Sequence, residues 1–440
     1  MKYFLLNAES YFVEGAIRST IYNCRTGRIL SLNPQLTKII SKSEQGSPLS
    51  KISEYYNYKE IAKEALQKLK KMEYGSFYDN FYRIEKLKPP TTKNSVLESS
   101  LPFVTGGFIE LTPECNLNCS FCNPDSFKIN RLTGCKRWPS SASPKGNKAM
   151  QLKDWKEVIK KLYLLKCRTL YFIGGEPLLK KKDLIELFAY AAETGITGIH
   201  IFTNGTLFDA EITEAFRKYN VMPVIQVYSD NEEITDAITG IKGSHRQLIN
   251  NLELLKQNGV KFSLMLVKLD KYADSYSKAA EYFNGFAPIK VINSNIYPDT
   301  KDKSGFAKQL FKKDANDIYG GHLPAEQFYL NCERNSCWFQ KLSFTFRGDM
   351  TPCPMARSEI IGNFLDNRFN NLIKLQSDIS KLWNMTRDNI EICKDCEYRY
   401  YCKDCRPLEK STSGSNNIKM RSRFCLYNPY TGEWGGENGK

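Results

Sequence analysis

Apolar and polar positions alternate in short runs along the first part of the chain and predict strands followed by helices. The strand-like runs are residues 3–8, 11–14, 20–23 and 28–32. The turn at 25–27 joins the last two runs as a hairpin. Apolar residues at helical spacing follow at 34–40, 47–55 and 61–69. This order predicts a small, winged-helix-like α+β domain over residues 1–87.

A polar, proline-containing stretch at residues 88–99 predicts a linker, and the pattern changes after it. Strand-like runs then alternate with amphipathic helices, of which 153–166 and 184–194 are the clearest. The strand-like runs are 107–112, 169–173, 198–202, 224–227, 261–266 and 290–292. Repeated β–α units predict parallel strands with right-handed crossovers. The fold class expected for residues 100–300 is therefore α/β, with a partial (β/α)6 TIM-like barrel.

Two segments depart from this pattern. Residues 123–150 are rich in Ser, Pro, Lys and Gly and predict a long loop inserted into the barrel. After a bridging segment at 301–330, periodicity fades over residues 331–440 and cysteines become frequent. The sequence has no apolar run of about 18 residues and no signal-peptide pattern at its start, so we expect a cytoplasmic protein without a membrane partner.

The chain of 440 residues contains 14 cysteines but only three histidines. In a reducing cytoplasm such cysteines are more often metal ligands or catalytic groups than disulfides. Because imidazoles are so few, we expect sites made of thiolates alone. The formal charge of +15 fits an acidic partner such as a nucleic acid, an anionic surface or an acidic peptide, and fits solubility equally well.

Three cysteines, Cys115, Cys119 and Cys122, follow the first predicted barrel strand. Three thiolates can hold a [4Fe–4S] cluster and leave its fourth iron open, whereas a zinc site would need a fourth ligand. This Cys-x3-Cys-x2-Cys spacing, with Phe121 before the third cysteine, resembles the radical SAM superfamily. The resemblance implies a cluster that binds S-adenosylmethionine, with these three cysteines as its ligands and as the catalytic centre.

Turns after the next predicted strands match further motifs of that superfamily. Gly174-Gly175-Glu176-Pro177 resembles the turn that binds the amino group of S-adenosylmethionine, where glycines permit close backbone approach and Glu176 offers a negative charge. Thr203-Asn204-Gly205 resembles the turn on the ribose side. Ser229 matches a polar position that reaches the ribose or carboxylate, and residues 236–244 resemble the family's aspartate and glycine loop. These turns follow strands, at the edge where parallel α/β folds bind ligands.

Beyond residue 331 the cysteines follow the pattern Cys-x10-Gly-x4-Cys, then Cys-x2-Cys-x5-Cys-x2-Cys, then one more Cys. The pattern resembles the SPASM domain, which carries two auxiliary [4Fe–4S] clusters. The resemblance assigns the first auxiliary cluster to Cys332, Cys337, Cys353 and Cys405. It assigns the second to Cys393, Cys396, Cys402 and Cys425. The short gap before Cys405 departs from the family pattern, and structural zinc is the alternative for the paired cysteines.

Three further cysteines fit no such pattern. Cys24 and Cys167 lie beside strand-like runs, and we interpret them as small apolar residues. Cys135 belongs to the 123–150 insert, where it is either a plain loop residue or part of a substrate channel.

The order of strands before helices in residues 1–87 resembles the RiPP recognition element, a domain that binds leader peptides of ribosomally made precursors. The resemblance implies that a leader pairs with the edge of the strand at 28–32 and packs against the helix at 61–69. Lysines on this helix would suit an acidic leader, although a solvated helix face explains them more simply; they are Lys59, Lys63, Lys68, Lys70 and Lys71.

Together the resemblances imply a radical SAM/SPASM oxidoreductase that matures a precursor peptide, with S-adenosylmethionine, three [4Fe–4S] clusters and a flavodoxin or ferredoxin as reductant. A 5′-deoxyadenosyl radical would install a thioether or carbon–carbon crosslink. One alternative is an anaerobic sulfatase-type maturase that oxidises a Cys or Ser on a protein. The other is a radical SAM enzyme that modifies RNA, but the sequence contains no RNA-binding motif, so no nucleic-acid partner is expected.

Overall fold

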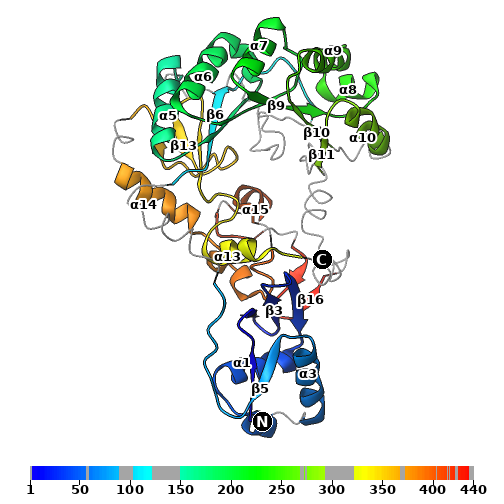
Figure 1. The fold of residues 1–440 in the computed structure, drawn as a ribbon, viewed down its shortest axis with the longest axis vertical. Helices are drawn as coiled ribbons and strands as arrows, with labels where there is room; N and C mark the ends of the chain where they lie inside the picture. The colour runs from blue at the N-terminus through cyan, green and yellow to red at the C-terminus, as the bar shows by residue number, and fades with distance from the viewer. Residues whose placement is uncertain are drawn as a thin grey trace. The chain divides into compact units, whose positions relative to one another are not determined.

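The computed structural model describes residues 2–55, 59–88, 103–120, 149–267, 272, 275–292, 322–366, 372–402, 404–413, 415, 417–421 and 425–435. The chain folds into two compact units (Figure 1). Unit 1 comprises Met1–Ser95, Leu310–Cys337 and Trp383–Lys440, and unit 2 comprises Val96–Gln309 and Trp338–Leu382. Unit 1 is thus assembled from both ends of the sequence. The predicted domain boundaries are finer than this division and stay predictions.

Unit 2 is built on a nine-stranded sheet in the order β11-β10-β9-β8-β7-β6-β12-β13-β14. Neighbouring strands from β11 to β12 pair in parallel, and β13 and β14 continue the sheet in antiparallel pairing. The parallel strands predicted from the sequence are β6 (Gly106–Thr112), β7 (Thr169–Gly174), β8 (Gly198–Thr203), β9 (Val221–Val227), β10 (Ser263–Val267) and β11 (Ile289–Ile292). The predicted α/β class, with a central and mostly parallel sheet, is confirmed.

The sheet is wider than the sequence predicts. The additional strands are β12 (Lys341–Phe344), β13 (Asp349–Thr351) and β14 (Gly362–Asn363). They lie in the segment where cysteines replace periodicity. With three and two residues, β13 and β14 are too short to give a readable alternation, and β12 contains only two apolar residues among its four.

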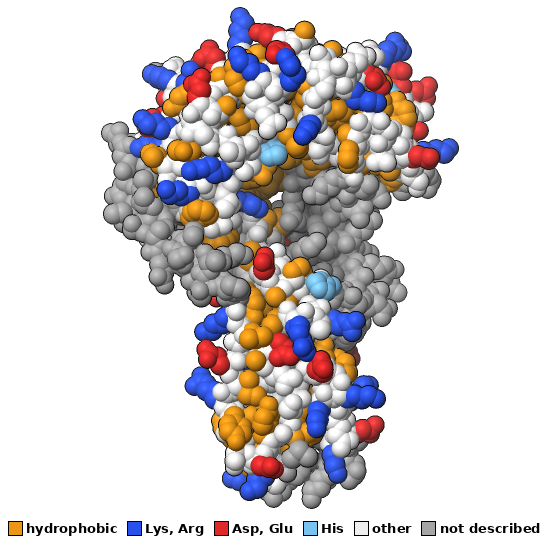
Figure 2. Space-filling view, viewed as in Figure 1, with side chains coloured by type: hydrophobic (Ala, Val, Ile, Leu, Met, Phe, Trp, Pro, Cys, Tyr) orange, Lys and Arg blue, Asp and Glu red, His pale blue; other side chains and the backbone are white. Residues whose placement is uncertain are grey.

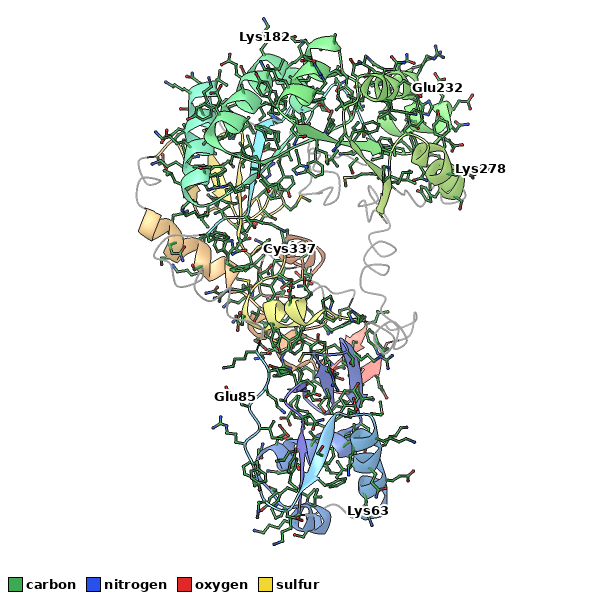
Figure 3. The ribbon with its side chains drawn as sticks, in the orientation of Figure 1. Lys63, Glu85, Lys182, Glu232, Lys278 and Cys337 are labelled. Carbon is green, nitrogen blue, oxygen red and sulfur yellow. The ribbon has the colours of Figure 1, made fainter. Side chains whose placement is uncertain are left out.

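Helices connect the parallel strands and cover one face of the sheet (Figure 1). They are α5 (Leu152–Leu164), α6 (Lys181–Thr194), α7 (Ala210–Lys218), α8 (Glu232–Thr239), α9 (Ser244–Gln257) and α10 (Tyr276–Asn284), and α14 (Leu372–Trp383) follows β14. Phe188 of α6 packs edge-on against Phe172 of β7, with ring centroids 5.2 Å apart. Lys182, Glu232 and Lys278 mark the side of α6, α8 and α10 that faces away from the sheet (Figure 3).

The amino-terminal part of unit 1 contains strands followed by helices, in the predicted order. Strands β2 (Ser10–Glu14), β3 (Ser19–Asn23) and β4 (Arg28–Leu32) form an antiparallel sheet in that order. The helices are α1 (Pro34–Glu44), α2 (Leu49–Tyr55) and α3 (Lys59–Lys71). A strand after the helices is not predicted: β5 (Gly75–Tyr78) pairs with β1 (Tyr3–Leu6). Phe4, Leu32, Ile40, Leu66 and Leu69 belong to the core that joins strands and helices.

The rest of unit 1 packs on the opposite face of the same small sheet. Its elements are α13 (Ala325–Glu333), the 3-10 turns η6 (Arg387–Asn389) and η7 (Cys393–Asp395), α15 (Arg406–Ser413), β15 (Tyr427–Asn428) and β16 (Glu433–Trp434). Tyr22 stacks on Phe328 with ring centroids 4.0 Å apart, and its hydroxyl donates to the Leu323 carbonyl at 2.6 Å. The Thr20 hydroxyl donates to the Glu397 carbonyl at 2.9 Å. Residues from both ends of the chain therefore share one core.

Basic and acidic side chains are interspersed on both units, and the described part of the face in Figure 2 shows no continuous basic area. None of the described helices combines the length and the apolar character needed to cross a membrane.

Candidate functional site

The loop that follows β6 carries Cys115 and Cys119, two of the three cysteines predicted to hold a cluster. Cys122 lies outside the described residues. Two N–H groups point at the Cys115 sulfur: the Leu117 backbone amide at 3.4 Å and the Asn204 side-chain amide at 3.9 Å. Hydrogen bonds of this kind stabilise a thiolate, which is the form of cysteine that binds iron.

The same loop is held by the C-terminal end of α8. The backbone amide of Asn118 donates to the Thr239 carbonyl at 2.9 Å, and that of Ser120 donates to the Ile238 carbonyl at 2.8 Å. Gly240 follows with a φ of +69°, and a Cβ there would stand 2.7 Å from the Asn118 oxygen. The end of α8 therefore sets the position of the cysteine loop.

Replacing Gly240 by alanine should lower the iron content of this site several-fold, because the new methyl group would push the Asn118 backbone away from α8. Gly243→Ala is the matched control: its φ is +83°, so the backbone cost is similar, but a Cβ there meets nothing within 4 Å. Iron per chain after anaerobic reconstitution is the measurement. Equal losses in the two variants would show that backbone strain alone matters and that the contact does not.

The turn Gly174-Gly175-Glu176-Pro177 lies at the end of β7, as predicted. Its Glu176 carboxylate is fully buried. One carboxylate oxygen accepts from the Leu178 amide at 3.0 Å and the Thr203 hydroxyl at 2.8 Å, and the other accepts from the Asn204 amide at 2.8 Å. Glu176 therefore ties the turn after β7 to the turn after β8, a role that the sequence does not predict.

The two glycines of this turn are explained by close backbone approach to the start of the cysteine loop. The Gly175 amide donates to the Thr112 carbonyl at 2.8 Å, and the Glu176 amide donates to the Glu114 carbonyl at 2.7 Å. A Cβ on Gly174 would stand 2.4 Å from the Thr112 oxygen, and one on Gly175 would stand 2.0 Å from the Glu114 oxygen. The turn therefore lies in direct backbone contact with the residues that lead into Cys115.

Burial raises the pKa of Glu176 from 4.5 to about 7, although three hydrogen bonds favour its ionised form. Between these values the folded protein binds a proton that the unfolded chain has released, so the free energy of unfolding falls as the pH rises through this window. The loss amounts to about 3 kcal/mol. Urea unfolding of the wild type and of Glu176→Gln across the window checks this, because the glutamine variant should lack that part of the pH dependence.

A closed set of hydrogen bonds lies beside Cys115 and includes Asn204 of the predicted ribose-side turn. Asn204 donates to the Asn116 side-chain oxygen at 2.9 Å, and Asn116 donates to the Thr206 hydroxyl at 2.8 Å. Thr206 in turn donates to the Asn204 side-chain oxygen at 2.7 Å. Asn116 and Thr206 are not predicted from the sequence. The position of Asn116 inside the cysteine triad is the signal that could have found it.

The two remaining predicted positions end a strand and cap a helix. Ser229 follows β9, is buried, and accepts from the Asn231 amide at 3.2 Å. Asp236 of α8 accepts from the Ser244 hydroxyl at 2.9 Å and from the His245 amide at 3.0 Å at the start of α9. Burial alone would raise the pKa of Asp236, but these hydrogen bonds hold it below its usual range. Residues 236–244, which run from the second half of α8 to the first residue of α9 and are not a single loop as predicted, thus form a brace between these two helices.

The four cysteines predicted to hold the second auxiliary cluster all lie in unit 1. They are Cys393, Cys396, Cys402 and Cys425. Three of them, Cys396, Cys402 and Cys425, pack against Tyr398 and Tyr427. Burial, followed by the charges of neighbouring thiols, raises the pKa of Cys396, and burial raises that of Cys393 to about 12. Within the described ranges, no group of three or more His, Cys, Asp or Glu side chains is arranged as a metal site.

The cysteines predicted to hold the first auxiliary cluster are divided between the units. Cys353 belongs to unit 2, whereas Cys332, Cys337 and Cys405 belong to unit 1, where Cys337 follows α13 (Figure 3). Burial raises the pKa of Cys332 to about 12, and this residue packs with Cys24 against the core around Tyr22 and Phe328. This ligand set stays a prediction.

Cys24 and Cys167 behave as the small apolar residues that the sequence suggests. Cys24 belongs to the same packed group, and Cys167 is fully buried with its thiol donating to the Thr169 carbonyl at 3.2 Å. Cys135 lies outside the described residues.

A buried ion pair lies on the strand that leads into the cysteine loop. Glu110 of β6 binds Arg357 through both carboxylate oxygens, and one of these contacts, from Nη1 to Oε2, measures 2.6 Å. Both side chains are almost completely buried. Arg357 follows β13, so this pair links the strand before Cys115 to the segment after Cys353.

Comparisons with known proteins agree with this geometry. Residues 109–282 match the model of the Radical SAM superfamily. The AdoMet-dependent heme synthase of Oleidesulfovibrio alaskensis is 22% identical over 357 residues, which are 73% of this chain and 86% of that protein. The antilisterial bacteriocin subtilosin biosynthesis protein AlbA of Bacillus subtilis is 22% identical over 326 residues, which are 70% of this chain and 68% of that protein.

The fold is also that of a solved structure. Streptococcus suis SuiB bound to precursor peptide SuiA aligns with 97% of this chain and 100% of its own, with a TM-score of 0.51 and 15% identity. The match of residues 109–282 covers the cysteine loop, the turns after β7 and β8, and the brace between α8 and α9. Residues 109–282 therefore form a radical SAM domain, and the chain is a radical SAM enzyme.

Proposed function

We propose that the chain matures a ribosomally made precursor peptide by forming a thioether or carbon–carbon crosslink. AlbA is a bacteriocin biosynthesis protein, and SuiB is bound to its precursor peptide in the aligned structure. Both similarities support a peptide as the substrate of this chain.

The observation that carries the proposal is the outer edge of β4. Among the described residues, β4 pairs with β3 on one side, and on the other side only Arg28 forms a bridge, to His322. The Leu323 amide donates to the Gly27 carbonyl at 2.9 Å, so the peptide groups of every second residue, Ile29 and Ser31 among them, face this edge. An extended leader peptide can add to such an edge as a further strand.

Helix α3 lies against the same core as β4, because Leu66 and Leu69 share a hydrophobic cluster with Leu32. The side chains of a leader bound at the β4 edge would therefore be able to contact α3. Lys63 of α3 is exposed (Figure 3), as are Lys68, Lys70 and Lys71. These lysines suit an acidic leader.

The proposal assigns Cys115, Cys119 and Cys122 as ligands of the [4Fe–4S] cluster that binds S-adenosylmethionine. When bound there and reduced by a flavodoxin or ferredoxin, that cluster would supply the electron for reductive cleavage of S-adenosylmethionine, and so the hydrogen-atom abstraction from the peptide. The second electron released by crosslink formation would leave through the auxiliary clusters. The turns at 174–177 and 203–205, together with Ser229, hold S-adenosylmethionine. The buried Glu176 carboxylate keeps the two turns at a fixed separation, since it binds Thr203 and Asn204 directly.

The proposal also assigns two auxiliary [4Fe–4S] clusters to the eight cysteines beyond residue 331. Cys393, Cys396, Cys402 and Cys425 fit such a group, because four soft thiolates from one buried region are a ligand set for iron–sulfur clusters. Zinc is the competing occupant, and metal analysis distinguishes the two.

The test is an anaerobic reaction of the reconstituted chain with dithionite, S-adenosylmethionine and the peptides encoded by short reading frames beside its gene. We expect 5′-deoxyadenosine together with a peptide whose mass has fallen by a pair of hydrogen atoms for each crosslink. If 5′-deoxyadenosine forms while every peptide tested keeps its mass, the chain is not a maturase of those peptides.

The role of the β4 edge is tested by Ser31→Pro with Ser31→Ala as the control. Proline removes an N–H group that faces the edge, whereas alanine keeps it. Both variants lose the hydrogen bond from the Tyr398 hydroxyl to the Ser31 hydroxyl, which measures 3.1 Å. We expect Ser31→Pro to weaken binding of the substrate peptide at least tenfold in fluorescence anisotropy and Ser31→Ala to bind as the wild type does. Equal binding by both variants would exclude strand addition at β4.

The similarity to AdoMet-dependent heme synthase over 73% of this chain favours a second candidate, the modification of a haem precursor. Incubation with an iron porphyrin under the same conditions separates the candidates. A changed porphyrin mass, unaffected by Ser31→Pro, would favour this function over peptide maturation.

A further inference from the structure

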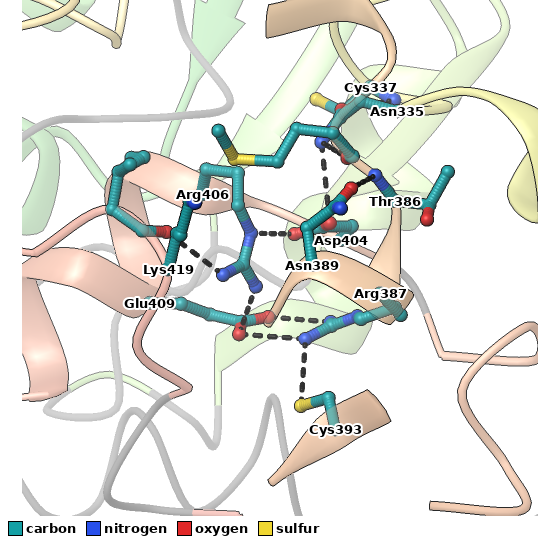
Figure 4. Close-up of polar contacts among 12 residues, drawn as sticks. Asn335, Cys337, Thr386, Arg387, Asn389, Cys393, Asp404, Arg406, Glu409 and Lys419 are labelled. Atoms are coloured by element: carbon teal, nitrogen blue, oxygen red, sulfur yellow. Dashed lines mark hydrogen bonds and ion pairs between the residues drawn. The ribbon is translucent and has the colours of Figure 1, made fainter. Parts of the chain in front are cut away.

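Four charged side chains are buried together in unit 1, near the cysteines of the second predicted auxiliary set (Figure 4). Glu409 accepts from Arg387 Nη1 at 2.8 Å and from its Nη2 at 2.6 Å. Arg406 binds both Glu409 and Asp404. Among the described residues drawn in this network, two arginine charges face two carboxylate charges.

Arg387 also contacts a cysteine of this set. Its Nη1 donates to the Cys393 sulfur at 3.6 Å (Figure 4). A second arginine does the same at another cysteine of this set: Arg421 Nη1 donates to the Cys425 sulfur at 3.8 Å, and the same nitrogen donates to the Tyr427 carbonyl at 2.8 Å. Two guanidinium groups therefore point at sulfurs of one four-cysteine group, from opposite ends of its sequence.

The two contacts differ in how their charge is balanced. Arg387 shares its charge with Glu409, so it brings mainly a hydrogen bond to Cys393. Arg421 is held by the Tyr427 carbonyl, and no ion pair joins it to a carboxylate among the described residues. It therefore brings a net positive charge next to Cys425.

We propose that Arg387 and Arg421 raise the reduction potential of the cluster held by Cys393, Cys396, Cys402 and Cys425. The inference rests on the proposed function, because it requires an iron–sulfur cluster at these cysteines. Reduction adds one negative charge to such a cluster, and hydrogen bonds to its sulfurs together with nearby positive charge stabilise the reduced form. A thiolate is also a much better acceptor for a guanidinium than a neutral thiol.

The experiment uses the full-length holoprotein, with iron and zinc counted per chain and each cluster followed by EPR during a redox titration. Arg421→Gln removes the charge but keeps an amide donor, and Arg421→Lys restores the charge. We expect Arg421→Gln to lower the equilibrium constant for reduction of one cluster about tenfold, which is a midpoint lower by about 59 mV. Arg421→Lys should recover most of this shift, and the other EPR signals should keep their midpoints.

Arg399→Gln is the matched control, because Arg399 lies between the same cysteines in sequence but donates to Asp388 and to the carbonyls of Glu14 and Cys396. Its substitution should change the equilibrium constant for reduction of this cluster by less than a factor of two. Arg387→Lys tests the second donor: it removes the guanidinium that reaches Cys393 but keeps a cation beside Glu409. If Arg421→Gln loses iron, the titration of Arg387→Lys still decides the question.

The outcomes separate the inference from the proposed function. If the wild type holds its full iron and forms 5′-deoxyadenosine, but Arg421→Gln and Arg387→Lys titrate as the wild type does, the inference is overturned and the proposed function stands. If wild-type metal analysis finds zinc in place of this cluster, the inference falls together with the auxiliary-cluster part of the proposed function.

Discussion

Gly175→Ala is expected to abolish both iron incorporation at the cysteine loop and binding of S-adenosylmethionine. A Cβ at this position would stand 2.0 Å from the Glu114 oxygen, and that oxygen belongs to the backbone, which cannot rotate away as a side chain can. Either the turn after β7 or the residues before Cys115 must then shift. Iron per chain and equilibrium dialysis with labelled S-adenosylmethionine, both under anaerobic conditions, measure the two effects.

Gly106→Ala is the control for this substitution. Gly106 opens β6, the strand that leads into the same loop, and a Cβ there would meet Tyr171 at 3.4 Å, an ordinary contact. We expect iron content and ligand binding close to those of the wild type. Full iron and normal binding in Gly175→Ala would contradict the close approach of the two backbones.

Arg357→Met is expected to destabilise the folded protein by about 3–5 kcal/mol, because it leaves the Glu110 carboxylate buried without a counter-charge. The double variant Glu110→Met with Arg357→Met should recover most of this loss, since no uncompensated charge remains. Chemical unfolding of the wild type, both single variants and the double variant gives the comparison.

An additive double-mutant cycle would contradict this expectation. If the losses in the two single variants simply add in the double variant, the pair is not coupled and its bidentate geometry contributes nothing to stability. We expect a strongly non-additive cycle, because removal of either partner leaves the other one buried.

The sequence predicts the parallel part of unit 2 well, for a physical reason. Strands β6, β7, β9 and β10 are largely buried and mostly apolar, and β8 alternates buried with partly buried positions, so these runs stand out against the amphipathic helices between them. Strands β13 and β14 are too short for such a signal, and β12, with two apolar residues among four, is not apolar enough to give one. The packing of residues 322–337 on the small sheet of unit 1 depends on contacts such as Tyr22 with Phe328, which local patterning cannot reveal.

In the candidate site, too, the sequence reveals the motifs but not the residues that surround them. Spacing and residue type identify the turns after β7 and β8, because glycines and polar residues interrupt an otherwise apolar pattern. The partners of Glu176 are not visible in the sequence, since Thr203 and Asn204 lie in another β–α unit. Arg387 and Arg421 could not be singled out among 63 basic residues, because only the fold brings them to cysteine sulfurs.

The assembly of unit 1 from both ends of the sequence has a consequence for synthesis on the ribosome. Tyr22 forms its hydrogen bond with Leu323, 301 residues later, so the small sheet leaves the exit tunnel long before its second packing face exists. At elongation rates of about 5–20 residues per second this wait lasts roughly 15–60 s. During that time Tyr22 and Ile29 lack their later partners, so the nascent chain is a candidate for chaperone binding. The edge proposed to receive the peptide is therefore completed only after the radical SAM domain has been made.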